Sequence, residues 1–196
     1  MKIINQVVQE LKKGKVIICP TDTVYGLIAD ATNKKAVEKI FKIKKRPKSK
    51  SLPIFVKDFK MAKKLAEIDK NQEKFLKKAW PGKTTAVLKL KIENSLKIVN
   101  CKLKIYGIGK NTVALRIPDY KLINALLKKL NHPLAETSAN ISGRPPSVNI
   151  KEVLEQFTLR RAEGQPDFII DVGDLPKNKP SKVIDLTQSP PKVLRN

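Results

Sequence analysis

The sequence predicts an α/β protein in which helices flank a twisted, mixed sheet of parallel and antiparallel strands. Short runs rich in Val, Ile and Leu alternate with longer segments whose apolar residues recur at helical spacing. The closing runs follow one another too closely for helical crossovers, which indicates antiparallel pairing there. The 196 residues suffice for one substantial core and contain no repeat or low-complexity linker, so we expect a single domain over residues 1–196.

The first part of the chain predicts two helices and two strands. Apolar residues at helical spacing before Gly14 indicate a helix over residues 3–13, and "KVIICP" then reads as a strand. A second helix is expected over residues 34–45. It should end before Arg46-Pro47, because the residue preceding a proline disfavours the α region. The run "LPIFV" predicts the next strand.

The rest of the chain continues the alternation. Helices are expected over residues 58–66 and 70–79, before the turn at "WPG". The runs "TTAVLKL" and "TVALRIP" predict strands on either side of an irregular stretch from about 91 to 111. Asp119 is the expected N-cap of a helix that contains Leu122 to Leu130. A strand "PLAETSA", a helix around Val153, Leu154 and Phe157, and strands "DFIIDVG", "KVIDLT" and "KVLRN" follow.

The composition excludes several functional classes. No apolar run is long enough to cross a bilayer, and the amphipathic N-terminus with Glu10 does not resemble a signal peptide, so we expect a cytoplasmic protein without a membrane role. Cys19, Cys101 and the single His132 supply neither a zinc site nor a disulfide framework. His132 stands before a proline, where a surface or turn role is favoured over a Ser-His-Asp mechanism.

The net charge of +23 predicts a strong positive field. Such a field attracts nucleic acid without sequence preference. The lysines are nevertheless spread over every segment, with few aromatic residues between them as stacking platforms. A solvated surface is therefore the favoured interpretation, and a dedicated RNA-binding face is the alternative.

Polar residues gather where two predicted strands end. "PTDTVYGL" and "TSANISGRPPS" are rich in small hydroxyls, and such loops at strand ends suit phosphate oxygens or an amino acid, although either could be a capped turn. Neither a phosphate-binding GxxxxGK[ST] loop nor a complete GxGxxG motif is present. A bound nucleotide would therefore need side-chain cations, and the basic run "KKRPKSKSLP" over residues 44–53 offers several.

Taken together, these motifs resemble the YrdC-like threonylcarbamoyl-AMP synthases. The blocks occur in the family's order over residues 3–195, namely "PTDTVYGL", Lys44-x-Arg46-Pro47 with Lys50, "WPG", "TVALRIP", "TSANISG" and "SKVIDL" with "KVLR". The resemblance implies an enzyme that joins L-threonine, bicarbonate and ATP into threonylcarbamoyl-AMP and pyrophosphate. It also implies a large concave cavity on a twisted sheet, with Mg²⁺ carried by the ATP rather than by protein ligands. The product would serve separate enzymes that modify tRNA.

The resemblance also assigns site residues. Lys44 and Arg46 would be catalytic, and with Lys50 and Arg195 they would face the phosphates, while Lys45 and Lys48 would be surface charge. The other predicted nucleotide contacts are Thr112, Asn140 and Ser147, and the predicted threonine contacts are Thr23, Arg116, Ser138 and Ser181. Tyr25 would form part of the pocket wall. Arg116 could instead make a strand-end salt bridge, and Ser181 could be a turn hydroxyl.

Two other functions share the same module. One is an RNA-binding protein whose positive cavity holds tRNA or rRNA without the ATP chemistry. The other is a carbamoyl-transfer domain of hydrogenase-maturation proteins, but the chain lacks their zinc-finger and acylphosphatase-like segments. Longer relatives add a C-terminal domain, so we expect the single-domain form here.

Overall fold

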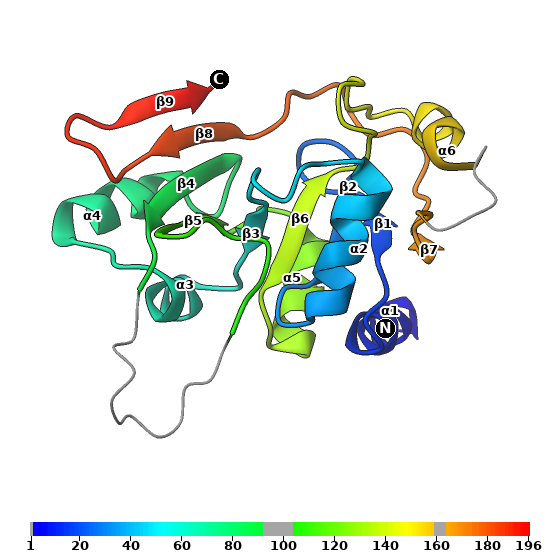
Figure 1. The fold of residues 1–196 in the computed structure, drawn as a ribbon, viewed down its shortest axis with the longest axis horizontal. Coiled ribbons are helices and arrows are strands. Elements are labelled where there is room, and N and C mark those ends of the chain that lie inside the picture. The colour runs from blue at the N-terminus through cyan, green and yellow to red at the C-terminus, as the bar shows by residue number, and fades with distance from the viewer. Residues whose placement is uncertain (1, 92–103, 159–163) are drawn as a thin grey trace.

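A nine-stranded mixed sheet runs through the part of the molecule that the computed structural model describes, residues 2–91, 104–158 and 164–196 (Figure 1). The strand order is β7-β1-β2-β6-β3-β5-β4-β8-β9. The strands are β1 Ile17–Cys19, β2 Gly26–Asp30, β3 Pro53–Phe55, β4 Thr84–Lys89, β5 Thr112–Arg116, β6 Leu134–Ser138, β7 Phe168–Ile169, β8 Lys182–Asp185 and β9 Lys192–Arg195. The predicted α/β class is confirmed.

Both pairing directions occur in the sheet. The pairs β1–β7, β3–β5 and β4–β8 are parallel, and the remaining pairs are antiparallel. The close spacing of the last two strands correctly predicts the antiparallel pair β8–β9. The strand before them does not join that pair, because β7 lies beside β1 at the opposite edge. The chain therefore crosses the width of the sheet between β7 and β8.

Six helices lie among the described residues, namely α1 Lys2–Lys12, α2 Lys34–Lys44, α3 Phe59–Leu65, α4 Lys70–Ala79, α5 Lys121–Leu130 and α6 Ile150–Thr158. Side-chain caps explain three of their starts, since Asn33, Asp58 and Asp69 each accept a hydrogen bond from a first-turn N–H group. The proline does not by itself end α2. Lys45 adopts a left-handed conformation with φ of 51° and donates its N–H to the last turn.

The structure differs from the sequence predictions at three other places. The strand β2 was not expected, because "GLIAD" follows the polar loop at Thr21 to Val24 and has no alternating pattern; it is buried along its whole length. Asp119 is not the N-cap of α5, which begins after Tyr120 without a side-chain cap. The backbone N–H of Asp119 instead donates to Asp22. Of "DFIIDVG", only Phe168 and Ile169 form a strand.

The irregular stretch predicted around residues 91–111 is only partly described. Residues 104–111 contain no helix or strand, whereas Cys101 and its neighbours lie outside the described residues. No helix within the described ranges has the length and apolar character needed to span a membrane.

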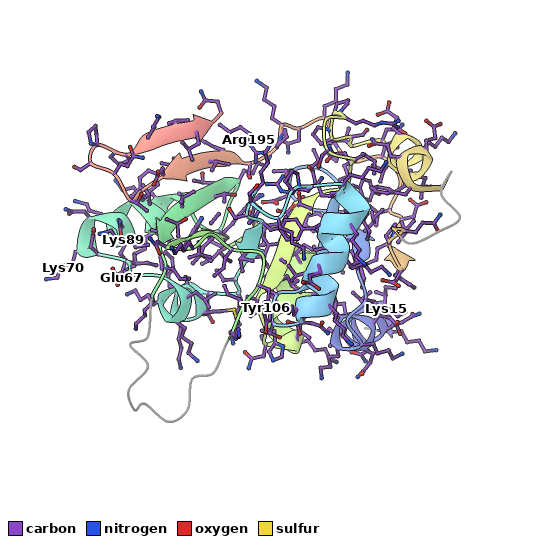
Figure 2. All side chains as sticks on the ribbon, viewed as in Figure 1. Lys15, Glu67, Lys70, Lys89, Tyr106 and Arg195 are labelled. Carbon is purple, nitrogen blue, oxygen red and sulfur yellow. The ribbon has the colours of Figure 1, made fainter. Side chains whose placement is uncertain are left out.

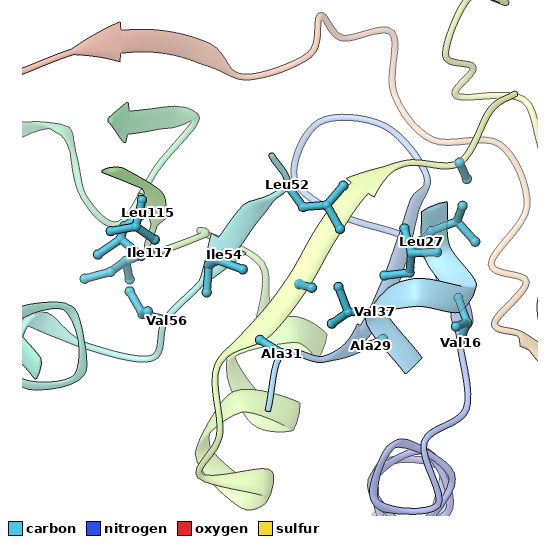
Figure 3. Packing of buried hydrophobic residues seen from close by; sticks show 14 of the residues in the cluster. Val16, Leu27, Ala29, Ala31, Val37, Leu52, Ile54, Val56, Leu115 and Ile117 are labelled. Atoms are coloured by element: carbon cyan, nitrogen blue, oxygen red, sulfur yellow. The ribbon is translucent and has the colours of Figure 1, made fainter. Parts of the chain in front are cut away.

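Alternation along the strands gives the sheet two different faces. One face contributes Leu27, Ile54 and Leu115 to the larger core (Figure 3), and α2, α3, α4 and α6 cover this core. The other face contributes Ile28, Phe55 and their neighbours to a smaller core beneath α1 and α5. Figure 1 shows α2 and α5 on opposite sides of β2 and β6. Because α1 and α5 cover only the β1–β2–β6 side of the second face, its remainder is open for a binding site.

Candidate active site

A cavity of about 290 Å³ lies on this open part of the second face. Its floor consists of alternate residues from neighbouring strands, namely Glu136 and Ser138 of β6, Pro53 of β3, Ala114 and Arg116 of β5, Thr85 and Val87 of β4, Val183 of β8 and Arg195 of β9. Thr23, Arg46, Ser51 and Ser181 complete much of the wall. This volume is close to the lower end of the range for small-molecule sites.

Arg46, Arg116 and Arg195 bring three positive charges to the cavity. Arg46 follows α2 and donates to the carbonyls of Lys50 and Ser51, at 2.9 and 2.8 Å. Burial and then the charge of Arg195 lower the pKa of Arg46, while burial is the main cause that lowers the pKa of Arg195. The guanidinium groups therefore repel one another, and a polyanion bound between them would offset this repulsion.

Arg116 also forms an ion pair with a buried residue, Asp22, which the sequence did not identify as its partner. Its Nη2 atom lies 2.6 Å from Oδ1 of Asp22, without good hydrogen-bond alignment, and both side chains are buried. Its Nε atom donates to the Gly82 carbonyl, and its guanidinium carbon lies 5.5 Å from the ring centroid of Phe55. The salt bridge left open as an alternative from the sequence is thus present, beside the cavity that Arg116 lines.

Ser181 connects β8 and β9 to the cavity. Its hydroxyl lies 2.9 Å from that of Thr85, and it receives a 3.1 Å hydrogen bond from Arg195. Arg195 Nε also donates to the Ser181 carbonyl. Ser181 therefore holds a cation in the cavity wall, which is more than a turn hydroxyl would do.

Lys44 does not line the cavity, because it is buried just behind the exit of β6. Its ammonium donates to the carbonyls of Ser138 and Asn140 at 2.6 and 2.8 Å, and to the Asn140 side-chain oxygen at 2.9 Å. These three bonds use all of its N–H donors. Burial lowers the pKa of Lys44 to about 8. A direct phosphate contact would require Lys44 to give up one of these bonds.

Ser138 and Asn140 belong to the same network. The Ser138 hydroxyl donates to the Asn140 side-chain oxygen at 2.6 Å, and the Asn140 amide donates to the carbonyls of Ile141 and Arg144. Ser138 lines the cavity, whereas the buried Asn140 shapes the loop that follows. The polar residues of "TSANISG" are thus largely engaged in fixing their own backbone.

The remaining predicted residues do not line the cavity. Lys50 is exposed, and Thr112 begins β5 on the face of Ala114. The hydroxyl of Ser147 donates to Glu152 and accepts from Asn149, before α6. Tyr25 donates to the Gly173 carbonyl at 2.6 Å, which ties down the segment that crosses the sheet. The structure thus gathers Thr23, Arg46, Arg116, Ser138, Ser181 and Arg195, but not Lys44, Lys50, Thr112, Asn140, Ser147 or Tyr25.

Sequence reasoning missed Glu136, the acidic residue in the cavity wall. Its pKa is raised to about 7 by burial, against the opposing charges of Arg116, Lys44 and Arg195. The sequence did contain a signal for Glu136. Burying a glutamate in a strand such as "PLAETSA" costs free energy, so its presence there indicates a role beyond packing. Within the described residues, no group of three or more His, Cys, Asp and Glu side chains could hold a metal ion.

Comparisons with known proteins agree with this fold. The sequence model of the Sua5/YciO/YrdC family, described as "Telomere recombination", matches residues 9–196. The chain is 37% identical to threonylcarbamoyl-AMP synthase of Pyrococcus abyssi and 32% identical to that of Bacillus subtilis, over 94% and 98% of its own length. It spans 51% and 52% of these relatives, about half their length.

A solved structure gives the same result. The crystal structure of Pyrococcus abyssi Sua5 complexed with L-threonine superposes with a TM-score of 0.82 at 37% identity, covering 98% of this chain and 53% of that one. Fold and sequence therefore lead to one conclusion. The chain belongs to the Sua5/YciO/YrdC family.

Proposed function

We propose that the chain is a threonylcarbamoyl-AMP synthase, which converts L-threonine, bicarbonate and ATP into threonylcarbamoyl-AMP and pyrophosphate. The observation that carries this proposal is that Arg46, Arg116 and Arg195, from three separate segments, line one cavity together with small hydroxyls. The names of the relatives and the threonine complex of Sua5 support it. Because the proposed reaction transfers the AMP group of ATP, the enzyme would be a nucleotidyltransferase.

The proposed chemistry suits such a cavity. The amine of threonine becomes a carbamate, and a carbamate oxygen attacks the α-phosphorus as pyrophosphate leaves. Negative charge develops on the phosphate oxygens, so catalysis depends on positioning and on fixed positive charge. Mg²⁺ would enter on the phosphates of ATP.

The roles of individual residues divide along the cavity. Arg46 and Arg195 are proposed to contact the phosphates, with the exposed Lys50 reaching them from the rim. Thr23, Arg116, Ser138 and Ser181 are proposed to hold threonine, with Arg116 using the N–H groups that Asp22 and Gly82 leave free. Thr112, Asn140 and Ser147 lie outside the cavity wall, and they are proposed to contact the rest of the nucleotide beyond it. Lys44 then acts by holding the loop at Asn140 in place.

The product would pass to separate enzymes that transfer the threonylcarbamoyl group to an adenosine of tRNA. The basic surface favours a second, weaker candidate, RNA binding without catalysis. Figure 2 shows blue-tipped side chains around the whole outline of the molecule rather than in one groove. This distribution matches diffuse attraction better than a specific RNA site.

The test is release of pyrophosphate from ATP with L-threonine and bicarbonate. We expect release that depends on both co-substrates, with threonylcarbamoyl-AMP detected by mass spectrometry. Reactions lacking threonine or bicarbonate are the controls. If ATP binds but pyrophosphate release is the same without threonine, the proposal is wrong.

A further inference from the structure

Glu136 lies in the cavity wall, at a position where the neighbouring glycine leaves space for its carboxylate. It lies in the middle of β6 opposite Ile28 of β2, and it lines the cavity with Ser138. A Cβ atom added to Gly26 on β2 would lie 3.2 Å from Oε1 of Glu136 and 3.2 Å from the Thr21 side chain. The missing side chain at Gly26 therefore leaves the room that the carboxylate occupies.

The carboxylate of Glu136 has no bonded partner among the described residues, while the cavity's cations have theirs. Arg116 is paired with Asp22, Arg46 is bonded to two carbonyls, and Arg195 is bonded to Ser181. Charged groups face Glu136 from several elements, namely Arg116 of β5, Lys44 of α2, Arg195 of β9 and Asp22 before β2, with the Cys19 thiol of β1 also near. A partly buried carboxylate without a hydrogen bond is costly, so it calls for a ligand that can donate one.

The proton affinity of Glu136 suits a base. Burial outweighs the neighbouring cations and raises its pKa to about 7, close to neutral pH. A group with such a pKa is ionised often enough to accept a proton and basic enough to hold it. The other polar groups of the wall are arginines, serines and threonines, which cannot take this role at neutral pH.

The proposed reaction has one step that needs a base. An amino acid reaches the site with its amine protonated, and an ammonium nitrogen has no lone pair with which to attack carbon. On the basis of the proposed function, we infer that the Glu136 carboxylate binds the ammonium group of the amino-acid substrate beside Thr23 and Ser138, and removes its proton before carbamate formation.

The step balances as follows. An N–H bond of the ammonium breaks, and the proton moves to a carboxylate oxygen of Glu136. The amine lone pair then forms the N–C bond to bicarbonate. The C–O bond to the bicarbonate hydroxyl breaks, and this hydroxyl leaves as water with a second proton from the nitrogen, giving the carbamate. Glu136 returns its proton to solvent before the next turnover.

The first experiment measures binding without catalysis. Calorimetry compares L-threonine with 3-hydroxybutyrate, which lacks the amine, in the wild type and in Glu136→Gln. We expect the substitution to weaken L-threonine binding about tenfold or more and to leave 3-hydroxybutyrate unchanged or tighter. An equal effect on both ligands, or no effect on either, would overturn the inference. Thermal unfolding shows that the isosteric variant is folded.

The second experiment follows threonine-dependent pyrophosphate release between pH 6 and 9.5. We expect kcat of Glu136→Gln to be about 100-fold below wild type at pH 7, and this deficit to shrink towards pH 9.5, where the substrate amine loses its proton unaided. Glu136→Asp should recover part of the rate. A wild-type rate and profile in Glu136→Gln would reject only the role of Glu136. An inactive wild type would reject the proposed function, and this role with it.

Discussion

Arg195 donates two hydrogen bonds to Ser181, one to its carbonyl and one to its hydroxyl. The pair joins β9 to the residue that precedes β8, and both side chains line the cavity. The guanidinium is therefore held at the cavity from the outermost strand of the sheet.

Replacing Ser181 with alanine should loosen this guanidinium. The variant loses the bonds that the Ser181 hydroxyl makes with Arg195 and Thr85 and keeps the bond from Arg195 to the carbonyl, so we expect KM for ATP to rise several-fold and the free energy of unfolding to fall by about 1 kcal/mol. Steady-state kinetics and urea unfolding measure the two effects. Lys182→Ala, at the exposed neighbouring position, is the matched control and should change neither.

Two cations two residues apart should behave differently. Arg46 lines the cavity, whereas Lys48 is exposed and pairs with Glu38 at 3.2 Å. We expect Arg46→Ala to lower kcat about 100-fold, the usual cost of removing a group that stabilises developing charge, and Lys48→Ala to keep wild-type turnover. Equal losses in the two variants would contradict the assigned cavity.

Lys44 should matter for stability at least as much as for chemistry. Lys44→Met leaves the acceptors of Ser138 and Asn140 without their buried donor, so we expect a loss of about 2–3 kcal/mol in the free energy of unfolding. Urea denaturation of Lys44→Met against Lys42→Met, an exposed position on the same helix, measures this cost. A loss no larger than in the control would mean that the network is weak.

The raised pKa of Glu136 predicts the pH dependence of stability. Because the folded state holds this proton more tightly than the unfolded chain, its stabilising contribution is complete below about pH 4.5 and is lost as the pH rises through about 7. Glu136→Gln should therefore gain stability relative to wild type as the pH rises from about 4.5 through 7, by about 3 kcal/mol at the upper end of this range.

Glu73 provides the comparison, because its pKa is shifted in the opposite direction to that of Glu136. The pKa of Glu73 is lowered by hydrogen bonds from Lys63 and Lys77, so its contribution is present above its ordinary pKa and is lost as the pH falls. Glu73→Gln should be less stable than wild type at neutral pH, whereas Glu136→Gln should be more stable than wild type there. Both differences should disappear in acid. Chemical denaturation at several pH values tests both, and a pH-independent difference for Glu136 would rule out its titration near neutrality.

RNA binding should be strong at low salt and unselective. With a net charge of +23, we expect unrelated RNAs of equal length to bind alike and to be released by about 0.2 M salt, because the attraction rests on counterion release. Filter binding with tRNA and a matched random RNA tests this. A preference for tRNA that survives such salt would favour the RNA-binding alternative.

The sequence predicts the local structure of this protein better than its site. The predicted helices match α1 to α6 within a few residues, and the strand predicted at "TTAVLKL" is present as β4, with Thr85 and Val87 on one face and Ala86 and Leu88 on the other. It fails at β2, whose five buried residues have no polar face to mark a strand.

Site contacts depend on partners that lie far away in the chain. Nothing near Arg116 in sequence announces Asp22 as its partner, and nothing near Lys44 announces the acceptors of Asn140. The family resemblance assigns ligand contacts to Asn140 and Ser138, yet much of their hydrogen bonding serves the backbone around them. Composition identifies polar clusters, but only the fold decides which atoms remain available.

The separation of β7 and β8 at opposite edges affects how this protein folds. The β1–β7 pair joins residues about 150 positions apart, and the cavity needs Thr23 as well as Arg195. Such non-local contacts carry a large loop-closure entropy and slow folding. We expect the cavity to be among the last features to form during refolding, after α2 and α5 have docked on the central strands.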